Sequence, residues 1–112
     1  MATFSLGKVL ITPGTPVRVT SNQASPGALL KCHSLLVECW WENMGRIFVG
    51  NSATMSMVNG SGALAILPVP TQNFISTFEI TVALSPNGLD ASNFWIDGEW
   101  KGDAVLVSGF VT

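Results

Sequence analysis

The side chains best suited to covalent or acid–base chemistry in this chain are one histidine, His33, and two cysteines, Cys32 and Cys39. A nucleophilic enzyme needs a base within hydrogen-bonding reach of its nucleophile. Cys32 and His33 are adjacent in a stretch with a strand-like pattern, and neighbouring side chains of a strand point to opposite faces. We therefore expect His33 to be a structural or surface residue. We predict that the protein is not an enzyme and has no catalytic residues and no small-molecule substrate.

Metal binding is also disfavoured by residue type and spacing. A zinc site needs about four ligands, which two cysteines and one histidine do not supply. Carboxylates gather only in residues 97–103 (DGEWKGD), where oxygen ligands could suit calcium. The spacing is not that of an EF-hand, however, and Lys101 lies inside the segment. We favour a solvated hairpin loop with two glycines at positive φ, and we expect no metal and no cofactor.

The two cysteines are too far apart to bridge if residues 29–41 form one long strand or two collinear strands. Seven residues of extended chain span about 23 Å at ~3.3 Å per residue, whereas a disulfide requires Cα atoms within about 7 Å. We therefore predict free thiols and assembly in a reducing cytoplasm.

Charge is scarce along the chain, at 11% of residues, where about 25% is usual. Residues 47–78 form a run of thirty-two without a charged side chain. Glycine, asparagine and proline interrupt this run, so it is not a transmembrane helix. A surface of small polar and exposed apolar residues suits contact with protein better than a free monomer.

The charged residues are scattered singly, five basic and seven acidic, giving a formal net charge of -2. Without a basic cluster, nucleic-acid binding is not expected. The first eight residues match neither an export signal nor a myristoylation site, so we expect no membrane partner.

Short apolar runs that stop at glycine, proline or asparagine predict strands, and no helical periodicity of any length is present. The predicted strands cover residues 4–11, 16–21, 30–41, 46–49, 54–58, 63–68, 74–84, 94–97 and 104–111. Eight or nine short strands predict an all-β fold, an antiparallel β-sandwich of jelly-roll type, in a single domain over residues 1–112.

Turn residues separate these strands. Pro13-Gly14 predicts a type II turn, and Asn59-Gly60 predicts a hairpin turn between two apolar runs. Residues 86–88 (PNG) predict another turn, and residues 22–28 a long loop. Alternation within residues 74–84 places even-numbered residues on a core face and leaves Glu79 as the only charge on the other face.

Four tryptophans and six phenylalanines remain to be explained. Trp40 and Trp41 must point to opposite faces of a strand, which leaves one indole outside unless the chain bends and buries both. Exposed aromatic side chains anchor protein interfaces or stack against sugars.

Residues 32–39 (CHSLLVEC) and 43–51 (NMGRIFVGN) resemble a pattern in small proteins that tailed bacteriophages encode among their capsid genes. That pattern is an alternating strand, an Asn-x-Gly turn, and an apolar strand ending in Val-Gly. The resemblance continues at residues 89–98 (LDASNFWIDG) and 102–108 (GDAVLVS), and weakly at residues 9–21. The Trp40-Trp41 pair departs from it, because a small residue and a proline are expected there.

The resemblance implies a capsid decoration or cement protein, with a β-sandwich or jelly-roll subunit that trimerises on the outside of the phage head. Its partners would be the major capsid protein and its own copies in a homotrimer. The location would be the outer capsid surface of the virion, after assembly in the host cytoplasm. Alternatives are a tail, fibre or baseplate component, or a carbohydrate-binding module that uses Trp40, Trp95 or Trp100.

We predict that the function is protein contact. The predicted interface residues are Phe4, Leu6, Trp40, Trp41, Trp95 and Trp100, with residues 2–6 as an arm over a neighbouring subunit.

Overall fold

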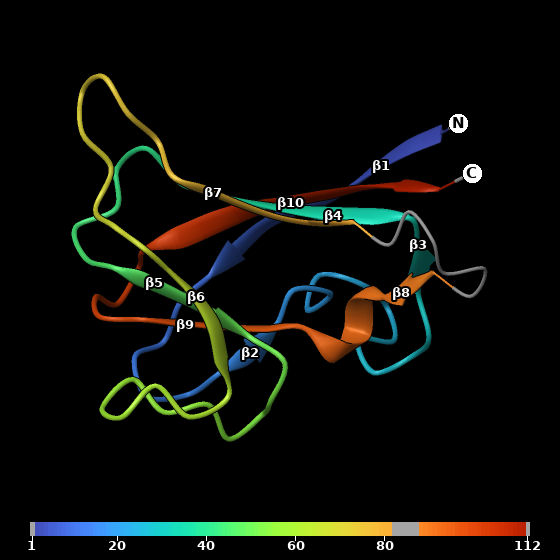
Figure 1. Cartoon of the computed structure of the whole chain (residues 1–112), viewed down its shortest axis with the longest axis horizontal. Coiled ribbons are helices and arrows are strands. Elements are labelled where there is room, and N and C mark those ends of the chain that lie inside the picture. The colour runs from blue at the N-terminus through green and yellow to red at the C-terminus, as the bar shows by residue number, and fades with distance from the viewer. Residues whose placement is uncertain (1, 82–87, 112) are drawn as a thin grey trace.

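The computed structural model describes residues 2–81 and 88–111, which fold into strands joined by turns and loops (Figure 1). The strands are β1 (Ala2–Leu10), β2 (Val17–Arg18), β3 (Lys31–Cys32), β4 (Ser34–Cys39), β5 (Ile47–Gly50), β6 (Ala63–Leu67), β7 (Thr77–Thr81), β8 (Leu89–Asp90), β9 (Trp95–Gly98) and β10 (Ala104–Val111). In these two ranges the only helix is one 3-10 turn, η1 (Ala91–Asn93), and no helix is long and apolar enough to cross a membrane. The predicted all-β class is confirmed.

The strands form two four-stranded antiparallel sheets and one small sheet. The first sheet has the order β1-β10-β4-β7, the second has the order β2-β9-β5-β6, and β3 pairs with β8. Figure 1 shows the first sheet above the second, as two layers. The outer strands are therefore β1 and β7 in the first sheet, and β2 and β6 in the second.

Both sheets contribute buried side chains to one hydrophobic core, and in the second sheet all four residues of β5 are buried. Val37 of β4 lies opposite Val107 of β10, and both are buried. Val49 of β5 lies opposite Ile96 of β9 in the second sheet and joins the same cluster. Each fully buried side chain of this size contributes about 1.5–3 kcal/mol relative to leaving it in water.

The predicted strand over residues 30–41 is two pieces that enter different sheets. The chain bends at His33, whose N–H donates to the Phe110 carbonyl at 2.6 Å. On either side of this bend, β3 pairs with β8 and β4 pairs with β10 and β7. Strand β8 was not among the predicted strands, because two residues are too few to show a period.

The predicted strand at residues 54–58 is wrong, since this segment lies in a series of turns. The Ser52 hydroxyl accepts from the Thr54 N–H at 3.1 Å, and the Ser56 hydroxyl accepts from the Val58 N–H at 3.2 Å. Serine side chains thus bind backbone groups that a strand ladder would otherwise use. Asn59-Gly60 does form a turn, but inside the long connection between β5 and β6 and not between two strands.

Two other sequence features have the predicted geometry. Gly14 has a φ of 82°, and the Thr15 N–H donates to the Thr12 carbonyl at 3.0 Å, as in a type II turn. Along β7, Phe78 and Ile80 pack against the core while Thr77 and Glu79 face outward. The prediction is wrong at Phe74, which was expected on the core face but is exposed and precedes the strand. Residues 82–87, which include part of this predicted strand and of the PNG turn, lie outside the described residues.

Candidate interaction surface

The cysteines are buried free thiols, as predicted. Burial raises the pKa of Cys39 to about 11. The hydrogen bond with Asn43 acts in the opposite direction and lowers this pKa, while the charges of Asp103 and Glu38 raise it slightly further. Burial, and then the charge of Asp90, also raise the pKa of Cys32. Both thiols are therefore protonated at neutral pH and are poor nucleophiles. Within residues 2–81 and 88–111, no three side chains of His, Cys, Asp or Glu gather as metal ligands would.

The predicted solvated hairpin loop at residues 97–103 is confirmed only in part: residues 99–102 are exposed, but Asp97 and Asp103 are buried, and the strands that it joins lie in different sheets. Asp97 is buried, and its Oδ1 accepts from the N–H groups of Gly14 at 3.1 Å and Gly98 at 2.8 Å. Asp103 is only 4% exposed. Of the two glycines, Gly102 has a positive φ of 91° and Gly98 does not. The carboxylates of Asp97 and Asp103 turn inward because buried backbone N–H groups beside them need acceptors away from water.

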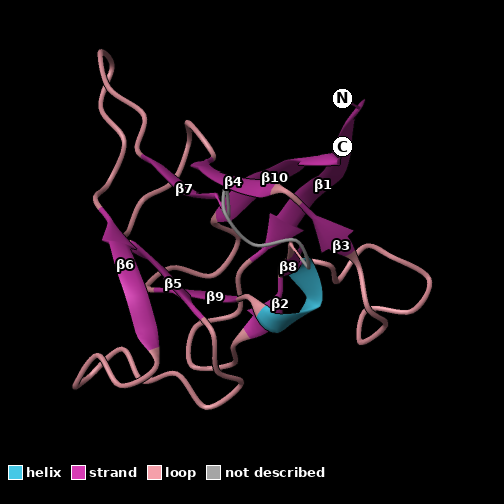
Figure 2. Ribbon diagram, turned by 45° about the vertical axis from the view of Figure 1, so that its right-hand side comes forward, coloured by secondary structure: helices cyan, strands magenta, loops and turns pink. Residues whose placement is uncertain are grey.

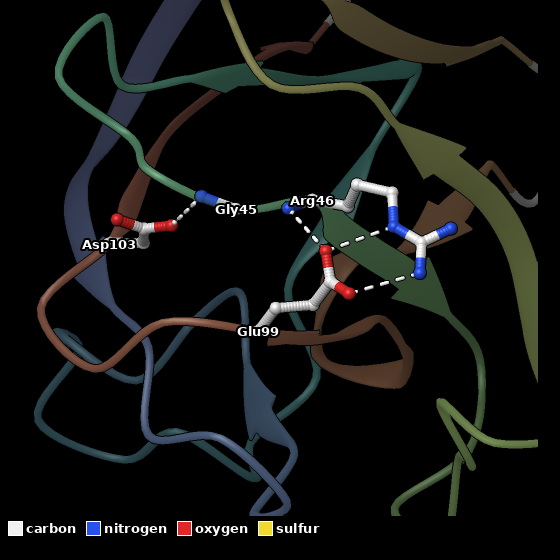
Figure 3. A network of polar contacts seen from close by, with 4 residues as sticks. All are labelled: Gly45, Arg46, Glu99 and Asp103. Atoms are coloured by element: carbon white, nitrogen blue, oxygen red, sulfur yellow. Dashed lines mark hydrogen bonds and ion pairs between the residues drawn. The ribbon is translucent and has the colours of Figure 1, made fainter.

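Two of these carboxylates clamp the connection between β4 and β5 to the loop between β9 and β10 (Figure 3). The Asp103 carboxylate accepts from the N–H groups of Met44 and Gly45, each at 2.9 Å. Glu99 accepts from the Arg46 N–H at 2.8 Å and binds its guanidinium through both oxygens, at 2.9 and 3.0 Å. The Arg46 hydrogen bonds and charge lower the pKa of Glu99 to about 2.

The clamp is completed by one amide and one close packing contact. The Asn43 side chain both donates to the Ala104 carbonyl and accepts from its N–H, each at 2.8 Å. A Cβ atom at Gly45 would lie 2.6 Å from Cδ1 of Trp100, so the indole packs directly against the glycine backbone. We call residues 40–46 and 99–104 the clamped loops.

The clamped loops hold three exposed apolar side chains in place: Trp41 and Met44 on one loop, and Trp100 on the other. Of the adjacent pair, Trp41 is exposed and Trp40 is half-buried, so one indole of the pair lies outside. The predicted contacts Trp41 and Trp100 are therefore accessible on a rigid support. Rigid, exposed aromatic side chains lose little conformational entropy when they bind.

The other two predicted tryptophan contacts are partly covered by cations. Lys8 Nζ lies 4.1 Å from the centroid of the Trp40 ring, and Arg18 Cζ lies 4.5 Å from that of Trp95. Arg18 is fixed by a 2.6 Å hydrogen bond to the Ser92 carbonyl. These rings are half-buried structural residues whose faces are less available than that of Trp100.

The N-terminal contacts are also placed differently from the prediction. The segment over residues 2–6 belongs to β1, which pairs with β10 from Ala2 to Leu10, so it is not a free arm. Leu6 is buried in the core, and Phe4 packs against the core beside Gly109. Alternation along a paired strand directs both side chains inward; Leu6 is buried and Phe4 is partly exposed.

The run that lacks charge also contains exposed apolar side chains. We call residues 51–76 the charge-free side; they comprise the connection from β5, strand β6 and the projecting connection to β7. Figure 2 shows these three parts along one side of the molecule. Six of the twelve large apolar side chains exposed in the described residues lie here: Val58, Leu64, Ile66, Val69, Phe74 and Ile75. The charge-free run indicated this surface, but the sequence did not single out these residues.

Comparison with protein-family models found no family that matches this chain, and comparisons with curated proteins and with solved structures found no similar protein. The resemblance to phage proteins therefore stays a prediction.

Proposed function

We propose that this protein is a structural virion protein that decorates a tailed-phage head. In this proposal its one domain is a jelly-roll β-sandwich that assembles as a homotrimer in the host cytoplasm. The trimer binds the outer capsid surface and stabilises contacts between major capsid proteins. The resemblance of residues 32–51 and 89–108 to small phage proteins supports a location on a phage head.

The observation that carries the proposal is the exposed apolar surface of a chain with few charges. Val58 is 98% exposed at the tip of a turn, and Phe74 is 59% exposed on the projecting connection. Trp41, Met44 and Trp100 add a second exposed group on the clamped loops. Twelve large apolar side chains are exposed among the described residues, and large exposed apolar patches mark sites of protein contact in soluble proteins.

Binding across capsid subunits would strengthen a head by mass action. A ligand that binds only the assembled shell lowers the free energy of that state, by an amount that grows with concentration and affinity. An oligomer that touches several capsid proteins at once also gains from its high effective concentration at the second and third contacts. The outcome would be a head that withstands higher internal DNA pressure before it opens.

The test uses heads of the source phage that lack this protein. Purified protein should sediment with the heads and raise the temperature at which they release DNA. Trp41→Ala should weaken sedimentation while leaving the unfolding temperature of the free protein nearly unchanged, since this side chain is exposed. Trp100→Ala should also weaken sedimentation but should lower the unfolding temperature somewhat, because the indole packs against Gly45. Wild-type protein that does not bind heads would refute the proposal.

A second candidate function is carbohydrate binding through Trp100, whose ring is exposed on a rigid loop. Of the three proposed sugar platforms, Trp40 and Trp95 already have a cation over the ring. Trp100 alone keeps the accessible face that stacking requires. Glycan-array binding that Trp100→Ala abolishes would favour this function. A tail, fibre or baseplate role would be distinguished by imaging where the protein lies on the virion.

A further inference from the structure

The exposed turn at Asn59 and Gly60 contains both groups of a reaction that needs no partner except water. The carbonyl carbon of an asparagine side chain, Cγ, can be attacked by the backbone nitrogen of the next residue. Glycine hinders this attack least, because it has no Cβ. The space around Gly60 is open, since an added Cβ would meet no described atom within 4 Å. Both residues are exposed, so water reaches them.

Two hydrogen bonds of the turn act on this reaction in opposite directions. The Asn59 Oδ1 accepts from the Ser61 N–H at 2.9 Å. Attack on Cγ moves negative charge onto Oδ1, and a donor already directed at that oxygen stabilises the charge. The Gly60 N–H, however, donates to the Ser56 carbonyl at 3.0 Å. While this second bond is made, water cannot remove the proton that the Gly60 nitrogen must lose.

Ser56 closes the turn, and we call residues 56–61 the Ser56 turn. The Ser56 hydroxyl accepts from the N–H groups of Val58 at 3.2 Å and Asn59 at 3.4 Å. The Ser56 N–H donates to the Ser61 carbonyl at 2.9 Å. One serine therefore holds the two residues before Gly60 by its side chain and Gly60 itself by its carbonyl. Exposed segments held by few hydrogen bonds open locally at a small cost in free energy.

We propose that Asn59 is a site of spontaneous deamidation whose rate is set by the Ser56 turn. When the turn opens, the Gly60 nitrogen loses its proton to solvent and forms a bond to Cγ of Asn59. The bond from Cγ to Nδ2 breaks, and Nδ2 takes a proton from solvent and leaves as ammonia. Water then opens the cyclic imide at either carbonyl, which leaves an aspartyl or an isoaspartyl residue at position 59. No oxidant or reductant is needed, because no atom changes its oxidation state.

The product changes the property that distinguishes this part of the chain. Residues 47–78 contain no charged side chain, and deamidation places a carboxylate inside this run. Replacing one neutral amide by one carboxylate takes the formal net charge from -2 to -3. An isoaspartyl residue also lengthens the backbone by one carbon, which the hydrogen bonds of the Ser56 turn do not accommodate. The inference does not rest on the proposed function, since the reaction needs only this chain and water.

The experiment incubates the purified protein at mildly alkaline pH, in buffer and in urea, and measures deamidation by mass spectrometry of chymotryptic peptides. Chymotrypsin cleaves after phenylalanine, so cleavage at Phe74 and Phe78 separates Asn59 from the other Asn-Gly pair of the sequence, Asn87-Gly88. Asn59 should deamidate in buffer, but about threefold to tenfold more slowly than in urea, because the hydrogen bonds of the turn must open first. This comparison uses the wild-type protein and does not depend on a variant.

Two serine variants test the role of the turn. Ser56→Ala removes the hydroxyl acceptor and should raise the rate at Asn59 in buffer about threefold, while the rate in urea stays unchanged. The matched control is Ser52→Ala, which removes a hydroxyl that accepts from the Thr54 N–H in the neighbouring turn. The control should keep the wild-type rate. An unmodified Asn59 in buffer, equal rates in buffer and urea, or equal rates in the two variants would overturn the inference.

Discussion

Asp103→Asn is expected to unfold the protein more easily, because the Asp103 carboxylate is the buried centre of the clamped loops. It accepts backbone N–H groups from Met44 and Gly45, one on each oxygen and each at 2.9 Å. An amide of the same shape keeps only one acceptor. Its NH₂ group would face one of the two backbone donors, with little room for water, since Asp103 is almost fully buried.

The magnitude follows from these two hydrogen bonds. A hydrogen bond to a charged group contributes about 1.5–3 kcal/mol, and a buried donor left without an acceptor costs about 1–3 kcal/mol. We expect a loss of about 3 kcal/mol in the free energy of unfolding. For a chain of this length, that loss lowers the Tm by about 12 °C.

The assay is urea and thermal unfolding followed by tryptophan fluorescence, with Glu99→Gln as the control. Glu99 lies in the same loop and makes the same kinds of contact, but its ion pair with Arg46 is exposed. Because solvent and salt screen exposed pairs, the control should lose much less stability. Equal losses in the two variants, or a loss below about 1 kcal/mol for Asp103→Asn, would refute the reasoning from burial.

Three further predictions concern pH, close packing and thiol reactivity. Burial alone would raise the pKa of Asp90, but hydrogen bonds and nearby charge outweigh it and lower this pKa; Arg46 lowers the pKa of Glu99 to about 2. Both groups therefore stabilise the fold fully above their unfolded pKa values, and this stability is lost as the pH falls from ~5 toward ~2. A urea midpoint that rises on acidification would contradict this prediction. Gly50→Ala should lower the free energy of unfolding by about 1–3 kcal/mol, since the new Cβ would overlap the Gly62 carbonyl oxygen. Gly60→Ala should lower it by about 1 kcal/mol in the same urea titration, because Gly60 has no atom within 4 Å of the new Cβ but has a φ of 75°. Both thiols should react with a disulfide reagent slowly in the native protein and quickly in urea, because they are buried and their pKa values are raised; rapid reaction without urea would show that they are accessible.

The strands could be predicted from sequence where a short apolar run covers a whole strand, as in residues 104–111, which match β10. The prediction failed at residues 54–58, because the hydroxyls of Ser52 and Ser56 bind backbone N–H groups of this segment locally. The clamp could not be found from spacing. Asp103 and Gly45 are 58 residues apart, and only the strand pairing brings them together. Exposed apolar residues were missed for a related reason, since the sequence shows where charge is absent but not which side chains face water.

The structure leaves the protein with less surface charge than the sequence suggests. Asp97 and Asp103 are buried and bind backbone N–H groups, and Asp90 caps η1 by accepting from the Ser92 N–H and hydroxyl. Arg46 and Glu99 neutralise each other. Several of the few charges of this chain thus fix loops. Carboxylates order the clamped loops, while residues 51–76 carry no charge at all. An ordered surface loses little entropy on binding, which is what the proposed role of a head-stabilising subunit would require.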